Sequence, residues 1–360
     1  MEIGDILLKA TQAGSSDIHI ISGMPPIIRQ NTELVMMKEY GEISHDTAWT
    51  MLQRFAGERN MATLSKHLDA DFATTIENGT RFRVNAHFQK WSIAIAFRAI
   101  QSTVPHIDNL GLPEVVKKLT NLPRGLVLVT GPTGSGKSTT LASMIDQINR
   151  NIAKHIITIE DPIEYDMISN ACVIEQREIG QDCPSFASGL KHSLRQDPDV
   201  ILVGEMRDLE TTSATITAAE TGHLVFSTLH TVNAAQTVER IIDIYPPGQQ
   251  NQIRSMLANT LQAVISQTLC KRIDRPGMVP CVEILLCNPA VRNCIRENRI
   301  FEINNILETS KKLGMQSLDQ SIMDMLSKGY ISEDDAMAKA KDPDKLRKTL
   351  SSKVPQPQLV

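Results

Sequence analysis

Residues 131–139 carry the strongest chemical signal in the chain. They spell Gly-Pro-Thr-Gly-Ser-Gly-Lys-Ser-Thr and fit G-x-x-x-x-G-K-[ST], a pattern in which successive backbone N–H groups surround nucleotide phosphates at a helix N-terminus. In this pattern Lys137 reaches the terminal phosphates, and the hydroxyl of Ser138 binds Mg²⁺. The predicted nucleotide-binding loop consists of Gly131, Pro132, Thr133, Gly134, Ser135, Gly136, Lys137, Ser138 and Thr139.

A carboxylate at the end of an apolar segment is a second chemical signal. A site that hydrolyses a nucleotide needs an acidic group near the metal ion, a residue that orients water, and positive charge for the transition state. Residues 200–205 read Val-Ile-Leu-Val-Gly-Glu, which is an apolar strand that ends in a carboxylate. Because ligands of such sheets bind at the carboxyl ends of strands, Glu205 is predicted to lie beside Mg²⁺ and not merely to cap a turn.

Residues 157–165 have the same form, because an apolar segment runs into a turn that contains Glu160, Asp161 and Glu164. Three carboxylates so close together repel one another unless a cation or a polarised water relieves them. This repulsion favours a role in the site over a purely structural turn. The sequence alone does not rank the three residues.

His230 follows the apolar segment 224–228, which has the pattern of a further strand of the same sheet. A lone histidine is more often a packed or capping residue. Its place at a strand end beside a phosphate-binding loop makes contact with a phosphate as well supported as a packing or capping role. Both interpretations stay open at this point.

Arginines stand out in two segments of the N-terminal part, 81–88 and 92–98. If these form a hairpin in which paired residue numbers sum to 181, one face is wholly apolar, and Arg81, Arg83 and Arg98 fall on the other. Arg83 then faces Arg98, which costs a few tenths to about 1 kcal/mol unless an anion relieves the repulsion. The face is predicted either to be solvated or to supply arginine fingers to a neighbouring subunit's phosphates.

The elements that position these residues follow from the hydrophobic pattern. Apolar segments alternate with helical ones from residue 126 onward, which is typical of a largely parallel sheet covered by helices. Strands are predicted at 17–21, 126–130, 155–159, 200–203 and 224–228, and helical segments at 44–55, 140–148, 249–272 and 310–350. In the proposed hairpin, Lys90 and Trp91 are unfavourable residues for a two-residue turn.

The length of the chain and a change in its residue pattern predict separate domains. Its 360 residues exceed the roughly 250–300 at which single cores stop growing, and a segment with prolines and a glycine interrupts the pattern after residue 100. We expect an N-terminal domain at 1–100, a linker at 101–113, an α/β domain with C-terminal helices at 114–350 and a flexible tail at 351–360.

The composition argues against several classes of protein. The net charge is −4 and aromatic residues make up 4%, so the chain offers nucleic acid neither a basic footprint nor many stacking platforms. No segment approaches the roughly 20 apolar residues of a membrane span, and no secretory signal is found, so a cytoplasmic location is expected. The six cysteines form no C-x-x-C pair, which argues against a zinc site and against disulfides.

Four segments together resemble the Walker A, Asp box, Walker B and His box of the secretion and pilus ATPase superfamily. They are the loop at 131–139, Ile-Thr-Ile-Glu-Asp-Pro-Ile-Glu-Tyr at 157–165, Ile-Leu-Val-Gly-Glu-Met-Arg-Asp at 201–208 and Ser-Thr-Leu-His-Thr at 227–231. Over nearly its whole length the chain resembles PilT-type type IV pilus retraction ATPases. The resemblance implies an α/β fold with a RecA-like P-loop ATPase domain, a smaller α+β PAS-like N-terminal domain, and a homohexamer with ATP and Mg²⁺ between the domains.

The resemblance also implies roles for single residues. Glu164 becomes the catalytic carboxylate, Glu205 the metal-associated one, and His230 a contact of the γ-phosphate. By position, the implied catalytic residues are Glu164, Glu205, His230, Arg83, Arg98 and Arg81, and the implied metal ligands are Ser138 and Glu205.

The implied function is retraction of type IV pili, in which ATP-driven domain rotation removes pilin subunits and drives twitching motility. An inner-membrane pilus platform protein and a possible paralogous retraction ATPase are the implied partners, and no nucleic acid is expected. The implied location is the cytoplasm, at the inner membrane beneath the pilus base.

Two departures from the family pattern are visible. Residues 290–297 resemble the Ala-Ile-Arg-Asn-Leu-Ile-Arg-Glu segment that retraction ATPases need, with Val291 and Cys294 in place of Ile and Leu. Residues 29–32 read Arg-Gln-Asn-Thr where the family has Arg-x-Asp-Gly, which removes the aspartate that usually contacts the nucleotide.

Other functions remain as alternatives. One is an accessory retraction ATPase of the PilU type, another is a related pilus assembly or type II secretion ATPase, and a third is an ATP-binding scaffold without turnover. The assembly and secretion relatives normally carry an extra N-terminal domain and a four-cysteine zinc insertion. The sequence before Leu126 has room for neither and there is no paired C-x-x-C, so a retraction ATPase or its accessory paralogue is expected. A GTP switch is disfavoured because no Asn-Lys-x-Asp follows the fourth strand.

Overall fold

The computed structural model describes residues 2–15, 17–30, 33–100 and 103–353. The chain forms two compact units, Met1–Thr103 with Glu164–Asp166, and Val104–Ile163 with Met167–Val360. Each unit has its own sheet and its own hydrophobic core. Asn31 and Thr32, where the sequence departs from the family turn, lie outside the described residues, as do residues 354–360 of the predicted tail.

The first unit is built on a six-stranded antiparallel sheet in the order β3-β2-β1-β6-β5-β4. Two helices share its core, in which the rings of Phe82 and Phe97 meet edge to face. Its elements are α1 (Ile3–Gln12), β1 (Asp17–Ile21), β2 (Ile27–Gln30), β3 (Glu33–Met36), α2 (His45–His67), β4 (Asp69–Thr75), β5 (Arg81–Gln89) and β6 (Ser92–Ile100).

Strands β5 and β6 form the predicted hairpin with the predicted register. Val84 pairs with Phe97 and Arg83 with Arg98, which confirms the register in which paired numbers sum to 181. The turn consists of Lys90 and Trp91, whose φ angles are 46° and 64°, although neither residue is favoured in such a turn. A slip by one residue would turn the apolar face outward, so the core fixes the register that the turn disfavours.

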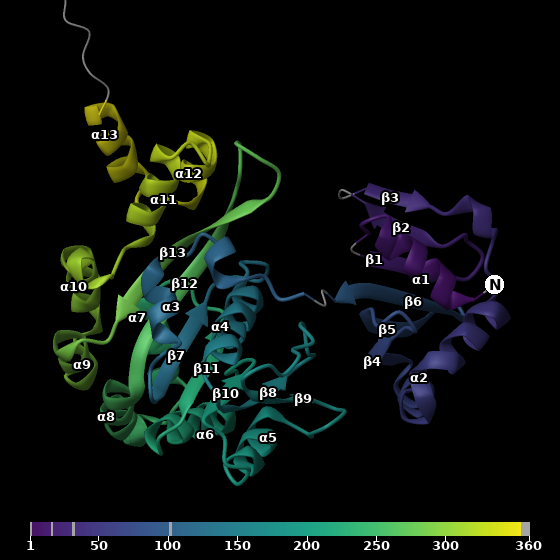
Figure 1. Ribbon diagram of the computed structural model, residues 1–360, viewed down its shortest axis with the longest axis horizontal. Helices are drawn as coiled ribbons and strands as arrows, with labels where there is room; N and C mark the ends of the chain where they lie inside the picture. Colours follow the sequence, from purple (N-terminus) through teal and green to yellow (C-terminus); the bar gives the residue numbers. More distant parts are fainter. Residues whose placement is uncertain (1, 16, 31–32, 101–102, 354–360) are drawn as a thin grey trace, which may run out of the picture. The chain divides into compact units, whose positions relative to one another are not determined.

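The second unit is built on a seven-stranded sheet in the order β13-β12-β7-β11-β10-β8-β9. All neighbouring strands are parallel except β12 and β13. The carboxyl ends of β7, β11, β10 and β8 therefore meet along one edge of the sheet (Figure 1). The strands are β7 (Gly125–Thr130), β8 (His155–Glu160), β9 (Val173–Glu178), β10 (Val200–Val203), β11 (Leu224–Leu229), β12 (Leu261–Lys271) and β13 (Met278–Leu286).

Both faces of this sheet are buried beneath helices. Along β7, Leu126 and Leu128 pack into the cluster formed with α5 to α10, whereas Val127 and Val129 pack into the cluster formed with α3 and α4. This alternation is expected of a parallel sheet covered on both sides. The helices are α3 (Glu114–Leu119), α4 (Lys137–Asn151), α5 (Phe186–Ser193), α6 (Leu209–Glu220), α7 (Ala234–Asp243), α8 (Gln250–Thr260), α9 (Pro289–Arg296), α10 (Ile303–Thr309), α11 (Leu318–Ser327), α12 (Glu333–Lys339) and α13 (Pro343–Lys353).

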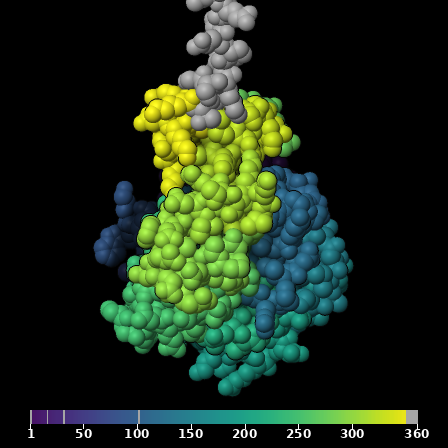
Figure 2. Space-filling view, turned by 90° about the vertical axis from the view of Figure 1, so that its left-hand side faces the viewer, coloured from purple at the N-terminus to yellow at the C-terminus, as the bar shows by residue number. Residues whose placement is uncertain are grey.

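The C-terminal helices pack around the end of β12 and the start of β13. Ile322 of α11 and Ala336 of α12 bury Cys270 and Cys281 in a small separate core. In Figure 2 this C-terminal region, in yellow, lies at the upper end of the second unit. All six cysteines are buried and unpaired in disulfides. None of the described helices has the length and apolarity of a membrane span.

The helix predicted over 249–272 is wrong in its second half. The helix α8 ends at Thr260, and β12 begins at Leu261 between β7 and β13. Because β12 is buried on both faces over 263–267, its apolar residues show no alternation, and such a run cannot be told from a buried helix by periodicity.

Candidate functional site

The phosphate-binding pattern connects β7 to α4, as the sequence predicts. Strand β7 is fully buried and ends at Thr130, and α4 begins at Lys137. Between them Gly131, Gly134 and Gly136 have φ angles of 142°, 77° and 86°, which L-residues with side chains rarely adopt. The Lys137 ammonium donates to the carbonyl oxygens of Gly131 at 2.9 Å and Pro132 at 3.1 Å, so it already lies within the loop.

The loop tolerates a side chain less well at Gly131 than at Gly134. A Cβ atom at Gly131 would overlap the carbonyl oxygen of Gln267, whereas a Cβ atom at Gly134 would meet nothing within 4 Å. We expect Gly131→Ala to lower the free energy of unfolding by about 3 kcal/mol, from overlap and left-handed strain together. Gly134→Ala carries the strain alone and should cost about 1 kcal/mol. Urea unfolding without nucleotide measures both, and equal losses would contradict the argument.

Glu205 and His230 meet at the carboxyl ends of β10 and β11. The Nε2 atom of His230 lies 3.0 Å from Oε1 of Glu205, and Nε of Arg207 lies 2.7 Å from the same oxygen. The hydrogen bond and charge of Glu205 raise the pKa of Arg207. Arg207 is not among the predicted site residues, although its place two residues after Glu205 is a signal that could have found it.

The three carboxylates at the end of β8 and just after it have different surroundings. Oε1 of Glu160 is buried and accepts hydrogen bonds from the Thr158 hydroxyl at 2.6 Å and from Nε2 of Gln176 at 3.2 Å. Asp161 and Glu164 are exposed. Internal hydrogen bonds indicate a structural role for Glu160, because a buried acceptor with two donors is a satisfied group, whereas exposed Asp161 and Glu164 are open to water.

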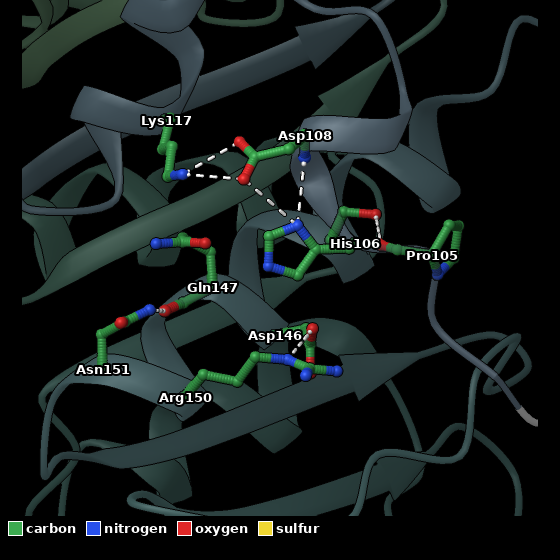
Figure 3. Close-up of polar contacts among 9 residues, drawn as sticks. Pro105, His106, Asp108, Lys117, Asp146, Gln147, Arg150 and Asn151 are labelled. Atoms are coloured by element: carbon green, nitrogen blue, oxygen red, sulfur yellow. Dashed lines mark hydrogen bonds and ion pairs between the residues drawn. The ribbon is translucent and has the colours of Figure 1, made fainter.

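The segment that enters the second unit is anchored to α4. The Ser143 hydroxyl, in the middle of α4, donates to the carbonyl oxygen of Pro105 at 2.7 Å. Figure 3 shows the next contacts, in which Lys117 of α3 donates to both carboxylate oxygens of Asp108 at 2.9 and 3.0 Å, and the Asp108 amide donates to Nδ1 of His106. The helix α4, which follows the phosphate-binding loop, is therefore hydrogen-bonded to the first residues of the second unit.

The predicted arginine face belongs to the first unit. Arg83 is exposed and directly opposite Arg98, and Nε of Arg98 donates to Oδ1 of Asp17 on β1 at 2.8 Å. Arg81 lies on the same side of β5 and is partly buried. The repulsion between the facing arginines is thus partly relieved by a carboxylate of the sheet itself, a contact that the hairpin alone does not predict.

The oxygen donors of the second unit fit Mg²⁺ only together with a nucleotide. Ser138 supplies a hydroxyl and Glu205 a carboxylate, which is the ligand chemistry that Mg²⁺ prefers. No group of three or more His, Cys, Asp or Glu among the described residues could hold a metal ion by itself. Mg²⁺ held by Ser138 and Glu205 would therefore need further ligands from substrate phosphates or water.

Comparison with known proteins gives one consistent result. A family described as "Type II/IV secretion system protein" matches residues 2–338. The chain is 44% identical over 344 residues to "Type IV pilus retractation ATPase PilT" of Pseudomonas aeruginosa, covering 96% of this chain and 99% of that protein. It is 37% identical over 347 residues to "Type IV pilus ATPase PilU" of the same organism, covering 96% and 91%.

A solved structure agrees with these relatives. The crystal structure of the pilus retraction motor PilT with bound ADP matches with a TM-score of 0.91 and 42% identity, over 97% of this chain and 99% of that one. The match confirms the fold class expected from the sequence, an α/β protein with a RecA-like domain and a smaller N-terminal domain.

Proposed function

This chain belongs to the type II/IV secretion system protein family, and from that premise we propose that it is an ATP-hydrolysing motor that retracts type IV pili. The observation that carries the proposal is the contact between Glu205 and His230, which follow strands β10 and β11 at the sheet edge where the loop containing Lys137 follows β7. Nearly full-length similarity to proteins described as retraction ATPases supports it.

The phosphate-binding loop and the residues at the neighbouring strand ends have separate roles in ATP binding and hydrolysis. The backbone N–H groups of residues 131–139 bind the phosphate chain of ATP, and Lys137 neutralises the terminal phosphates. Ser138 and Glu205 would hold Mg²⁺, which would supply positive charge to the phosphate oxygens. Glu164 orients the attacking water as a general base, and His230 contacts the γ-phosphate.

Arginines of the first unit complete the proposed site. Arg83 and Arg98, together with Arg81, stabilise the charge of the transition state when the N-terminal domain closes on ATP. Closure and release then rotate the two domains as rigid bodies. We propose that six copies form a ring in the cytoplasm at the pilus base, where rotation acts on an inner-membrane platform protein, with or without a paralogous ATPase. The proposed motor needs no nucleic acid.

The first test is ATP hydrolysis by the purified protein. Lys137→Ala should lower kcat/KM for ATP by about 10²-fold, because the loop loses its only cationic side chain toward the phosphates. Lys154→Ala is the matched control, because the Lys154 ammonium lies 3.5 Å from Asp199. These two residues immediately precede β8 and β10, at the amino ends of the strands, and Lys154 is not part of the loop. Phosphate release measures both rates, and equal rates in the two variants would remove the loop from the mechanism.

The same variant tests the biological function in cells. A strain that carries only Lys137→Ala should extend pili but not shorten them, so twitching is lost and surface pili accumulate. Pili that still shorten under low load would instead identify an accessory ATPase. The higher identity to PilT than to PilU, 44% against 37%, favours the main motor.

A further inference from the structure

Gln267 of β12 is a buried side chain in direct contact with the phosphate-binding loop. Its Nε2 atom donates to the carbonyl oxygen of Ser135 at 2.7 Å, and its Oε1 atom accepts from the hydroxyl of Thr140 at 2.9 Å. One amide thus joins the loop to the first turn of α4. Since the Ser135 carbonyl can only accept, the NH₂ group must face it, and this fixes the orientation of the amide.

Fixing the Ser135 carbonyl also fixes the donor that follows it. The carbonyl of Ser135 and the N–H of Gly136 belong to one planar trans peptide, so they point in opposite directions. Gln267 holds the carbonyl toward β12, and the N–H of Gly136 is therefore turned away from β12. Backbone N–H groups that are held in place before the anion arrives lose less entropy on binding than free ones.

The loop packs closely on the same side chain and strand. A Cβ atom at Gly136 would come within 2.7 Å of Nε2 of Gln267, so glycine is required there for the contact to form. One residue before Gln267, the hydroxyl of Ser266 lies 2.8 Å from that of Thr130, the last residue of β7. Two neighbouring side chains of β12 therefore form hydrogen bonds on either side of the start of the loop. Ser266 bonds to Thr130, just before the loop, and Gln267 bonds to Ser135 within it.

We propose that Gln267 is a positioning residue for the nucleotide, because it holds the Ser135–Gly136 peptide in the orientation that presents its N–H to a phosphate. The inference rests on the proposed ATPase function and extends it to a residue on β12, outside the phosphate-binding pattern. Both ends of the Gln267 amide are bonded to the protein, so its removal should act on binding of the phosphate chain and less on the chemical step.

The test uses Gln267→Met in the full-length protein. Methionine has nearly the same length and forms neither hydrogen bond, so we expect the Kd for ADP and the KM for ATP to rise at least tenfold, with kcat within about threefold of the parent. The matched control is Gln316→Met, since Gln316 donates the same kind of bond to the Val282 carbonyl at 2.9 Å, away from the loop. The control should keep the parent Kd.

A second variant keeps the test decisive if Gln267→Met does not fold. Thr140→Val removes the hydroxyl that anchors Oε1 but leaves the bond to Ser135, so the Kd for ADP should rise by about threefold. Parent affinity in a folded Gln267→Met protein, or in Thr140→Val where only that variant folds, would overturn the inference. A parent protein that neither binds ADP nor hydrolyses ATP would instead overturn the proposed function, which separates the two failures.

Discussion

Replacement of Arg83 by alanine is expected to lower kcat for ATP hydrolysis by about 10³-fold, within the range that arginine fingers contribute in other nucleotide hydrolases. The side chain is exposed and faces Arg98 across the hairpin, so its positive charge is available to an anion. Because a finger acts mainly on the transition state, KM for ATP should change far less than kcat. Steady-state phosphate release by the purified protein measures both constants.

Arg98→Ala is the matched comparison, because the two arginines occupy paired positions. Arg98 already donates to Asp17 at 2.8 Å, so we expect its replacement to lower kcat less than that of Arg83. Arg83→Lys keeps the charge without the planar fork and should recover only part of the rate. Hydrolysis at the parent rate by Arg83→Ala would show that the arginine face is merely solvated.

Glu164→Gln is expected to lower kcat by about 10²–10⁴-fold, the usual contribution of a general base. Glutamine keeps the size of the side chain but cannot take a proton from the attacking water. ADP binding should stay at the parent level, because Glu164 is exposed after β8 and is not part of the phosphate-binding loop. Single-turnover hydrolysis, together with ADP binding by calorimetry, separates the chemical step from affinity.

Glu160→Gln is the control, from the end of the strand that precedes this turn. Since Glu160 is buried and accepts from Thr158 and Gln176, we expect kcat to stay within about threefold of the parent and the loss to fall on stability instead. The opposite order, with Glu160→Gln inactive and Glu164→Gln active, would exchange the two roles. The variants thereby rank carboxylates that the sequence leaves unranked.

Features that depend on residues close together in the sequence are predictable from it. The glycine spacing between a predicted strand and a predicted helix identifies the loop at 131–139, and the structure places this loop between β7 and α4. The β5–β6 register follows from strict alternation of apolar residues. Strand β12 was missed because burial on both faces removes the alternation on which such a prediction depends.

Contacts between distant parts of the chain were not predictable in the same way. Ser135 and Gln267 are separated by 132 residues, and Asp17 and Arg98 by 81. Each pair depends on which strands become neighbours in a sheet, and residue types alone do not determine that order. The distinction between Glu160 and Glu164 fails for the same reason, since it requires the neighbouring strand β9 that carries Gln176.

The bond between Ser143 and Pro105 has a mechanical consequence. Ser143 lies six residues after Lys137 on α4, and at a rise of about 1.5 Å per residue these positions are about 9 Å apart along the axis. Tension on the chain at Pro105 would act on α4 less than two turns from Lys137, the residue proposed to reach ATP. A pulling force on this segment is therefore expected to make nucleotide turnover sensitive to load, without any change in the residues that perform the chemistry.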